Sequence, residues 1–115
     1  MASDHHDPHK GLGGLVISDE VLASIAVTAA RDIEGVSAIV PRAPDLSRLL
    51  KRDLRFVKIT GDEAEMTVEL MLRLRAGARL ITVSGKVQRA VKEALQNMTD
   101  RTVARVNLRI MGVDF

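Results

Sequence analysis

The chain of 115 residues contains no cysteine, which excludes disulfide bonds, thiolate catalysis and cysteine-based zinc sites. It also contains no tryptophan or tyrosine, and its two aromatic residues are Phe56 and Phe115. The core must therefore be built from aliphatic side chains. The chain also lacks the aromatic platforms on which single-stranded nucleic acids stack their bases.

Two further features are missing from the sequence. No apolar run approaches the ~20 residues that cross a bilayer, and the opening stretch, MASDHHDPHKGLGG, has no apolar segment of the kind that marks a secretory signal. We therefore expect a cytoplasmic protein. The net charge of +2 is a mild basic bias, well short of the dense Lys/Arg stripe of a DNA-binding domain.

The composition is that of a globular chain, with 46% hydrophobic and 28% charged residues. Residues 1–13 are polar and rich in glycine, so we expect a flexible N-terminal arm. Residues 14–115 then form a single domain, which is a usual size for one hydrophobic core.

The first half of that domain shows strand and helix patterns in turn. A short strand is expected at Leu15–Ile17, and Ser18 then caps a helix with acidic residues in its first turn and a stop near Gly35. A second strand covers residues 35–40. After two prolines, a short basic helical turn is expected within residues 46–53.

The second half contains the clearest alternation. A strand over residues 54–60 and a hairpin loop over residues 61–64 lead into a return strand with one apolar face, formed by Met66, Val68, Leu70, Leu72 and Leu74. A second amphipathic helix is expected from Leu80 to Asn97, with an apolar stripe of Val83, Val87, Val91, Ala94, Leu95 and Met98. The closing strand follows from Val103, with Val106, Leu108 and Ile110 on its buried face.

This order, β-α-β-β-β-α-β, predicts an α+β fold: a two-layer sandwich in which two main helices pack on one face of a small mixed sheet. The second helix is a crossover connection. The closing strand should therefore run parallel to the strand that ends at Arg75, with a right-handed connection.

Residues that could support catalysis are few. All three histidines, His5, His6 and His9, lie in the arm beside two aspartates, and the interpretations of this cluster are a divalent metal site or a polar arm. The carboxylates at positions 62, 63 and 65 lie in a hairpin loop, where solvated turn charge is the ordinary explanation. We therefore predict no enzymatic activity, no cofactor and no small-molecule substrate.

Basic residues on the other face of two strands are the main candidate for function. Arg73, Arg75, Arg105, Asn107 and Arg109 share the outward direction on strands that should be neighbours. Two interpretations remain open: an ordinary solvated sheet face, or a contact surface for an acidic partner, a membrane surface or another copy of the protein.

Three separated blocks of sequence resemble the alkaline shock protein family of bacterial envelope stress response proteins. They are GLVISDEVLASIAVTAARDIEGVSAIV, VQRAVKEALQNMT and VARVNLRIMGVDF, which occur in the family's order and cover most of residues 13–113. The chain departs from many family members in lacking a long charged tail and a proline near the start of the second helix.

This resemblance implies a non-enzymatic cytoplasmic protein linked to cell-envelope homeostasis. It also implies self-association and, for some members, attachment to the membrane through a membrane-anchored partner. The expected function is therefore that of a scaffold or adaptor that works by protein–protein contacts. The alternative is a small nucleic-acid-binding α+β module that uses its basic sheet face, and the scarcity of aromatic residues counts against it.

Overall fold

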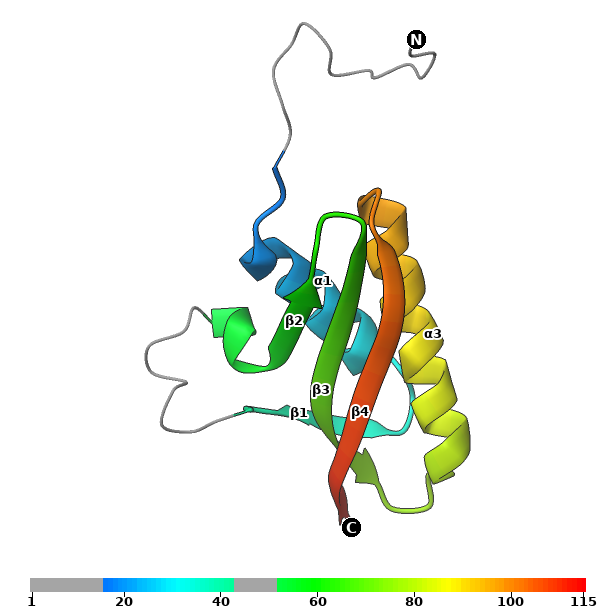
Figure 1. The fold of residues 1–115 in the computed structure, drawn as a ribbon. Helices are drawn as coiled ribbons and strands as arrows, with labels where there is room; N and C mark the ends of the chain where they lie inside the picture. Colours follow the sequence, from blue (N-terminus) through cyan, green and yellow to red (C-terminus); the bar gives the residue numbers. More distant parts are fainter. Residues whose placement is uncertain (1–15, 43–51) are drawn as a thin grey trace, which may run out of the picture.

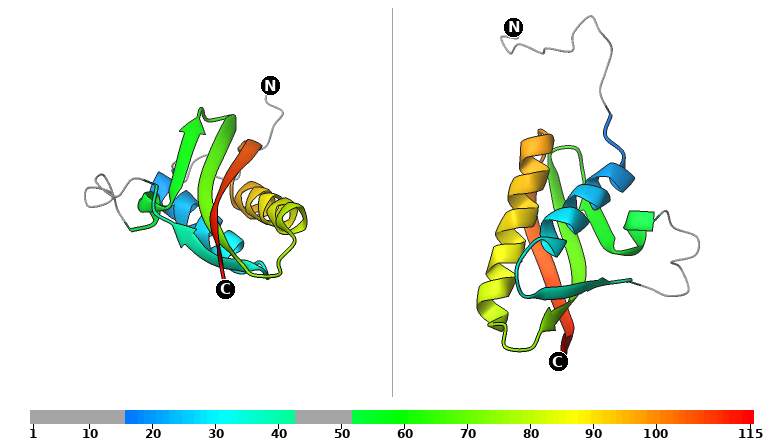
Figure 2. Two further views of the ribbon diagram at one scale, coloured as in Figure 1. Left: turned by 90° about the horizontal axis from the view of Figure 1, so that it is seen from below. Right: turned by 180° about the vertical axis from the view of Figure 1, so that it is seen from behind.

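The computed structural model describes residues 16–42 and 52–115, and Figure 1 shows their arrangement. Two helices, a short 3-10 helix and four strands follow one another along the chain, and both helices lie on the same side of the sheet (Figures 1 and 2). The predicted α+β two-layer sandwich is confirmed. The arm at residues 1–13 and most of the predicted basic turn lie outside the described residues, so both stay predictions.

Helix α1, Asp19–Arg31, begins as the sequence predicts. The Oγ of Ser18 accepts a hydrogen bond from the backbone N–H of Val21 at 3.3 Å, and Asp19 and Glu20 place negative charge in the first turn. The predicted strand at Leu15–Ile17 is wrong for the part that is described. Val16 and Ile17 belong to no strand, because this extended segment has no neighbouring strand to pair with.

The sheet is built around β3, Glu65–Arg75, which pairs with every other strand. Strand β4, Thr102–Asp114, runs parallel to β3 along its whole length, which confirms the predicted crossover through helix α3, Leu80–Met98. On the other edge of β3, β1 (Val36–Val40) and β2 (Val57–Gly61) are antiparallel to it and pair with successive segments of it.

After β1 the described chain extends to Arg42 and resumes at the 3-10 helix η1, Arg52–Arg55. Arg42 links these two parts of the chain. Its backbone N–H donates to the carbonyl of Arg55 at 2.8 Å, and its Nη2 donates to the carbonyl of Leu54 at 2.7 Å. Because residues 52–55 complete this turn, β2 begins at Val57 and not at residue 54, which corrects the predicted strand start.

The core lies between the sheet and the helices and is wholly aliphatic. The five predicted inward side chains of β3, from Met66 to Leu74, are all buried. Three alanines of α1 are completely buried, which lets this helix pack closely on its neighbours. From α3, the core receives Val83, Val87, Val91 and Leu95, whereas Met98 is 59% exposed and was wrongly predicted to join them.

Strand β4 is less regular than its sequence suggests. Its pairing with β3 skips Ala104 and Met111, so one extra residue is inserted at each position as a β-bulge. The inner face therefore carries Val103, Val106 and Val113, although these residues differ in parity. Leu108 and Ile110 lie on that face as predicted but are only half-buried.

Candidate interaction surface on the open face of the sheet

One face of the sheet is left uncovered by the two helices. Figure 1 views the molecule from this side, and Figure 2 shows both helices on the opposite side. The side chains on the uncovered face are mostly polar or charged and are exposed or half-buried, in contrast to their fully buried neighbours along β3. We call this surface the open face. It carries the residues that the sequence singled out.

The structure brings the five candidate residues onto neighbouring strands. Arg105, Asn107 and Arg109 of β4 are exposed and pair with Thr67, Glu69 and Met71 of β3. Arg75 is exposed at the end of β3, opposite Asp114. The sequence therefore placed these four residues on the same face correctly, because no bulge separates Arg105 from Arg109 in the register. Whether they bind a partner is a separate question.

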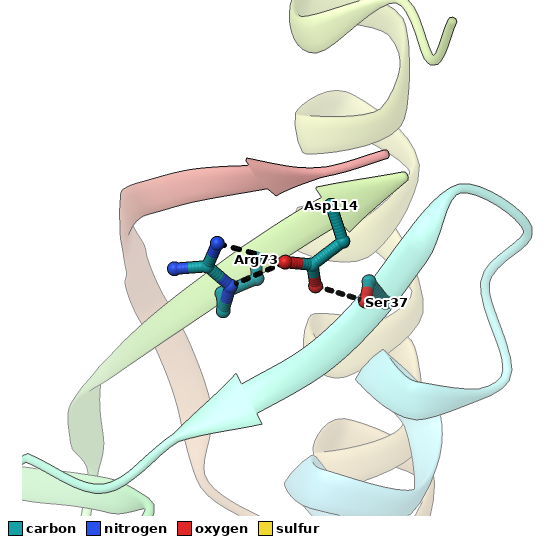
Figure 3. Close-up of polar contacts among 3 residues, drawn as sticks. All are labelled: Ser37, Arg73 and Asp114. Carbon is teal, nitrogen blue, oxygen red and sulfur yellow. Dashed lines mark hydrogen bonds and ion pairs between the residues drawn. The ribbon is translucent and has the colours of Figure 1, made fainter. Parts of the chain in front are cut away.

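Arg73 has a different role, shown in Figure 3. Its Nε and Nη2 both donate to Oδ1 of Asp114, at 2.8 and 2.7 Å, and the Oγ of Ser37 donates to the other carboxylate oxygen. These three side chains come from β3, β4 and β1, so they join the three strands across the open face. We call this group the Arg73–Asp114–Ser37 clasp.

Gly112 makes room for the clasp. It pairs with Arg73 across the two strands, and a Cβ atom at this position would lie 2.6 Å from Nη1 of Arg73. The guanidinium therefore lies over the glycine on its way to Asp114. The bulge at Met111 is what brings Gly112, and not a larger residue, opposite Arg73.

The clasp changes the electrostatics of this end of the face. The hydrogen bonds from Arg73 and then from Ser37 lower the pKa of Asp114, and desolvation opposes them without reversing the shift. The same hydrogen bond with Asp114 raises the pKa of Arg73. Because its charge is neutralised by a neighbour, Arg73 contributes less to an anion-binding surface than Arg105 or Arg109 does.

Two basic residues on this face were missed in the sequence. Arg42 and Lys58 line a shallow hollow of about 380 Å³ together with Arg109, and the same hollow is lined by Glu69, Leu70, Met71, Asn107 and Leu108. Lys58 pairs with Glu69 across β2 and β3. An alternating pattern could have indicated Lys58, but the position of Arg42 depends on its hydrogen bonds to the carbonyl groups of Leu54 and Arg55.

Arg42 has one polar atom without a partner. Its Nε is buried and makes no hydrogen bond, although its Nη2 is bonded to Leu54. Three cations, one carboxylate and the apolar side chain of Met71 thus meet in this hollow. Such a set can bind a carboxylate or phosphate by charge and hydrogen bonding.

The carboxylates of the hairpin loop have a structural explanation. In the hairpin loop, the carboxylate of Asp62 accepts hydrogen bonds from the backbone N–H groups of Ala64 and Glu65, both at 2.9 Å, and these bonds lower its pKa. This carboxylate shapes the turn. The three histidines lie outside the described residues, and within residues 16–42 and 52–115 no group of His, Cys, Asp and Glu is placed to hold a metal ion.

Comparison with known proteins assigns the chain to a family. A model of the ASP23 family, described as having a cell envelope-related function, matches residues 7–115. The chain belongs to this alkaline shock protein family. The resemblance seen in the sequence is thereby confirmed, and so is a role related to the cell envelope.

Two curated relatives are both described as uncharacterized proteins. YqhY of Bacillus subtilis is 27% identical over 120 residues, which cover 100% of this chain and 86% of that protein. Spy1535 of Streptococcus pyogenes serotype M6 is 26% identical over 103 residues, covering 89% of this chain and 80% of that protein. No solved structure matches the chain. None of the helices in residues 16–42 and 52–115 has the length and apolar character needed to span a membrane.

Proposed function

We propose that this protein is a non-enzymatic scaffold or adaptor on the cytoplasmic side of the cell envelope. It binds an acidic protein surface through its open face. The acidic surface belongs to a second copy of the chain or to a membrane-anchored partner.

The observation that carries this proposal is the cluster of cations around the hollow. Arg42, Lys58, Arg105 and Arg109 lie on or beside the open face, and Glu69 is the acidic residue among them. On this part of the face, four cations therefore surround one carboxylate. A concentrated charge of one sign attracts and orients a partner of the other sign.

Nucleic acid has less support as the ligand. The outward positions of β2, β3 and β4 on the open face carry no aromatic side chain on which a base could stack. Phe56 is half-buried against the core, where the guanidinium of Arg55 lies 5.4 Å from its ring centre. A protein partner needs charge complementarity but no stacking platform.

Sedimentation velocity of the purified chain at several salt concentrations tests the proposal. We expect association that weakens as salt rises, because screening reduces attraction between exposed charges. The double variant Arg105→Ser/Arg109→Ser should lose it while keeping its fold, since exposed charges contribute little to stability. The control Arg31→Ser/Lys86→Ser removes the same charge from the helical layer, where both residues are exposed, and should behave as the wild type.

A membrane-anchored partner is tested by fractionating cells that produce each variant. We expect the wild type and the control to co-purify with the partner from the membrane fraction, and the Arg105/Arg109 double variant to lose the partner and to be less enriched in that fraction. If the double variant matched the wild type in both sedimentation and fractionation, the open face would not be the interaction surface.

A further inference from the structure

Large apolar side chains gather at one end of the molecule. Eight are exposed in the described part of the chain, and five of these lie at the beginning of α3 or the end of β4: Leu80, Ile81, Met111, Val113 and Phe115. A backbone hydrogen bond of 2.8 Å from Ala76 to Asp114 holds the loop before α3 against the end of β4. Both segments therefore lie at the same end, which is the lower end in Figure 1. We call these five residues the apolar tip.

The start of α3 is unusual for a stable helix. Its N-cap residue is Arg79, which makes no side-chain capping bond, and its first turn contains no acidic residue. Leu80 and Ile81 occupy that turn with 51% and 85% of their surfaces exposed. A helix start normally carries Ser, Thr, Asp or Asn followed by acidic residues. Arg79, Leu80 and Ile81 do not stabilise the start of the helix, and this favours a role for them in contact with another molecule.

Two exposed arginines adjoin the apolar tip. They are Arg75 and Arg79, and the carboxylate of Asp114 is held by Arg73 in the clasp. Asp32 and Glu34 are exposed acidic residues after α1, and Glu34 is next to Gly35, whose carbonyl accepts a hydrogen bond from Arg75. Exposed apolar side chains next to arginines are typical of segments that lie in the interface of an anionic bilayer.

We propose that the apolar tip inserts into the surface of an anionic membrane. Leu80, Ile81 and Phe115 enter the boundary between headgroups and acyl chains, while Arg75 and Arg79 contact lipid phosphates. This surface shares Arg75 with the end of the open face but is otherwise separate from it, and the inference goes beyond the function proposed above. Because β3 and β4 run toward the tip, the open face stays accessible beside the membrane (Figure 1).

A membrane explains the tip better than a second copy does. A symmetric contact between two tips would bring the arginines of both copies, Arg75 and Arg79, into one interface, and like charges repel. A second hollow lies between α3 and β4. Neither this hollow nor the one on the open face is lined by a residue of the tip. A protruding apolar group suits a deformable lipid surface.

The absence of tryptophan from the chain allows a direct test with the full-length protein. A single tryptophan is introduced as Ile81→Trp, and vesicles of equal parts phosphatidylcholine and phosphatidylglycerol are added. We expect a blue shift of the tryptophan emission, and a much smaller shift with phosphatidylcholine alone. The control Met98→Trp places the probe at the other end of the same helix, where the residue is also exposed, and should show no shift.

Vesicle sedimentation measures the contribution of the apolar side chains. Ile81→Ser should lower the partition coefficient about tenfold, because burying such a side chain in an apolar medium contributes about that factor, and Met98→Ser should leave it unchanged. If the probe at position 81 does not shift, or shifts no more than the one at position 98, the proposal is wrong.

Two further outcomes would also overturn it. Loss of vesicle binding in Arg105→Ser/Arg109→Ser with full binding in Ile81→Ser would assign lipid contact to the open face. A lower sedimentation coefficient of Ile81→Ser without vesicles would make the tip a contact between copies. The two proposals can also fail separately. If the tip binds vesicles but the sedimentation test of the open face fails, this inference stands and the proposed function is refuted.

Discussion

Replacement of Leu70 and of Met71 by alanine, in two separate variants, tests the two-layer architecture at adjacent positions. Leu70 is 2% exposed and points into the core between the sheet and the helices. Met71 is half-buried and lines the hollow on the open face. The two residues are neighbours on the same central strand, so backbone position and strand propensity are closely matched.

The expected magnitudes follow from this difference in burial. Leu70→Ala leaves a cavity among Val57, Val68 and the helices, and such truncations cost about 2–5 kcal/mol of unfolding free energy. Met71→Ala removes a side chain that is already partly in water, so we expect a cost of no more than about 1 kcal/mol. The gap between the variants should therefore exceed about 1 kcal/mol, which is a clear difference in a two-state melt.

Urea unfolding followed by circular dichroism measures both values. We expect Leu70→Ala to lower the midpoint strongly without a large change in the slope, and Met71→Ala to lie close to the wild type. Equal destabilisation by the two substitutions would refute the assignment of inner and outer faces on β3.

Three further predictions concern the clasp and the arm. Gly112→Ala should displace the guanidinium of Arg73, since the new Cβ would lie 2.6 Å from its Nη1. NMR titration should then show the pKa of Asp114 rising toward its ordinary value. An unchanged pKa of Asp114 would count against the clasp. The lowered pKa of Asp114 adds stability above the unfolded pKa, near ~4, that is lost as pH falls through the folded value. Asp114→Asn should therefore be less stable than the wild type at neutral pH, and urea melts should converge in acid; a constant difference would contradict this. Deletion of residues 1–10 should leave the midpoint of thermal unfolding nearly unchanged, because these residues offer few apolar groups to a core. If a chelator lowered this midpoint in the full-length protein, the histidines would bind a metal.

Much of the fold was predictable because two patterns are strong. The alternation from Met66 to Leu74 identified the central strand and its inner face. The cap at Ser18 identified the start of α1, and the spacing of valines from Val83 to Val91 identified the buried side of α3. Together with the crossover rule, these features also gave the parallel pairing of β3 with β4.

Long-range geometry explains what the sequence could not supply. The bulges at Ala104 and Met111 depend on how β4 pairs with β3, and the second one places Gly112 opposite Arg73. The pattern therefore identified Arg73 as an outward cation but gave no sign of its bond to Asp114. Arg42 was missed for a similar reason, since its position is fixed by the carbonyl groups of Leu54 and Arg55, which are distant from it in the sequence.

Photo-crosslinking in living cells tests the central claim, that the open face binds a protein partner, most directly. A photoreactive residue replaces Asn107, which is exposed on the open face, or Thr28, which is exposed on α1 and serves as the control. We expect position 107 to crosslink to a second copy or to one membrane-anchored protein, and Arg105→Ser/Arg109→Ser to abolish that product. Crosslinks from position 28 with none from position 107, or a product at position 107 that persists without the two arginines, would contradict the account.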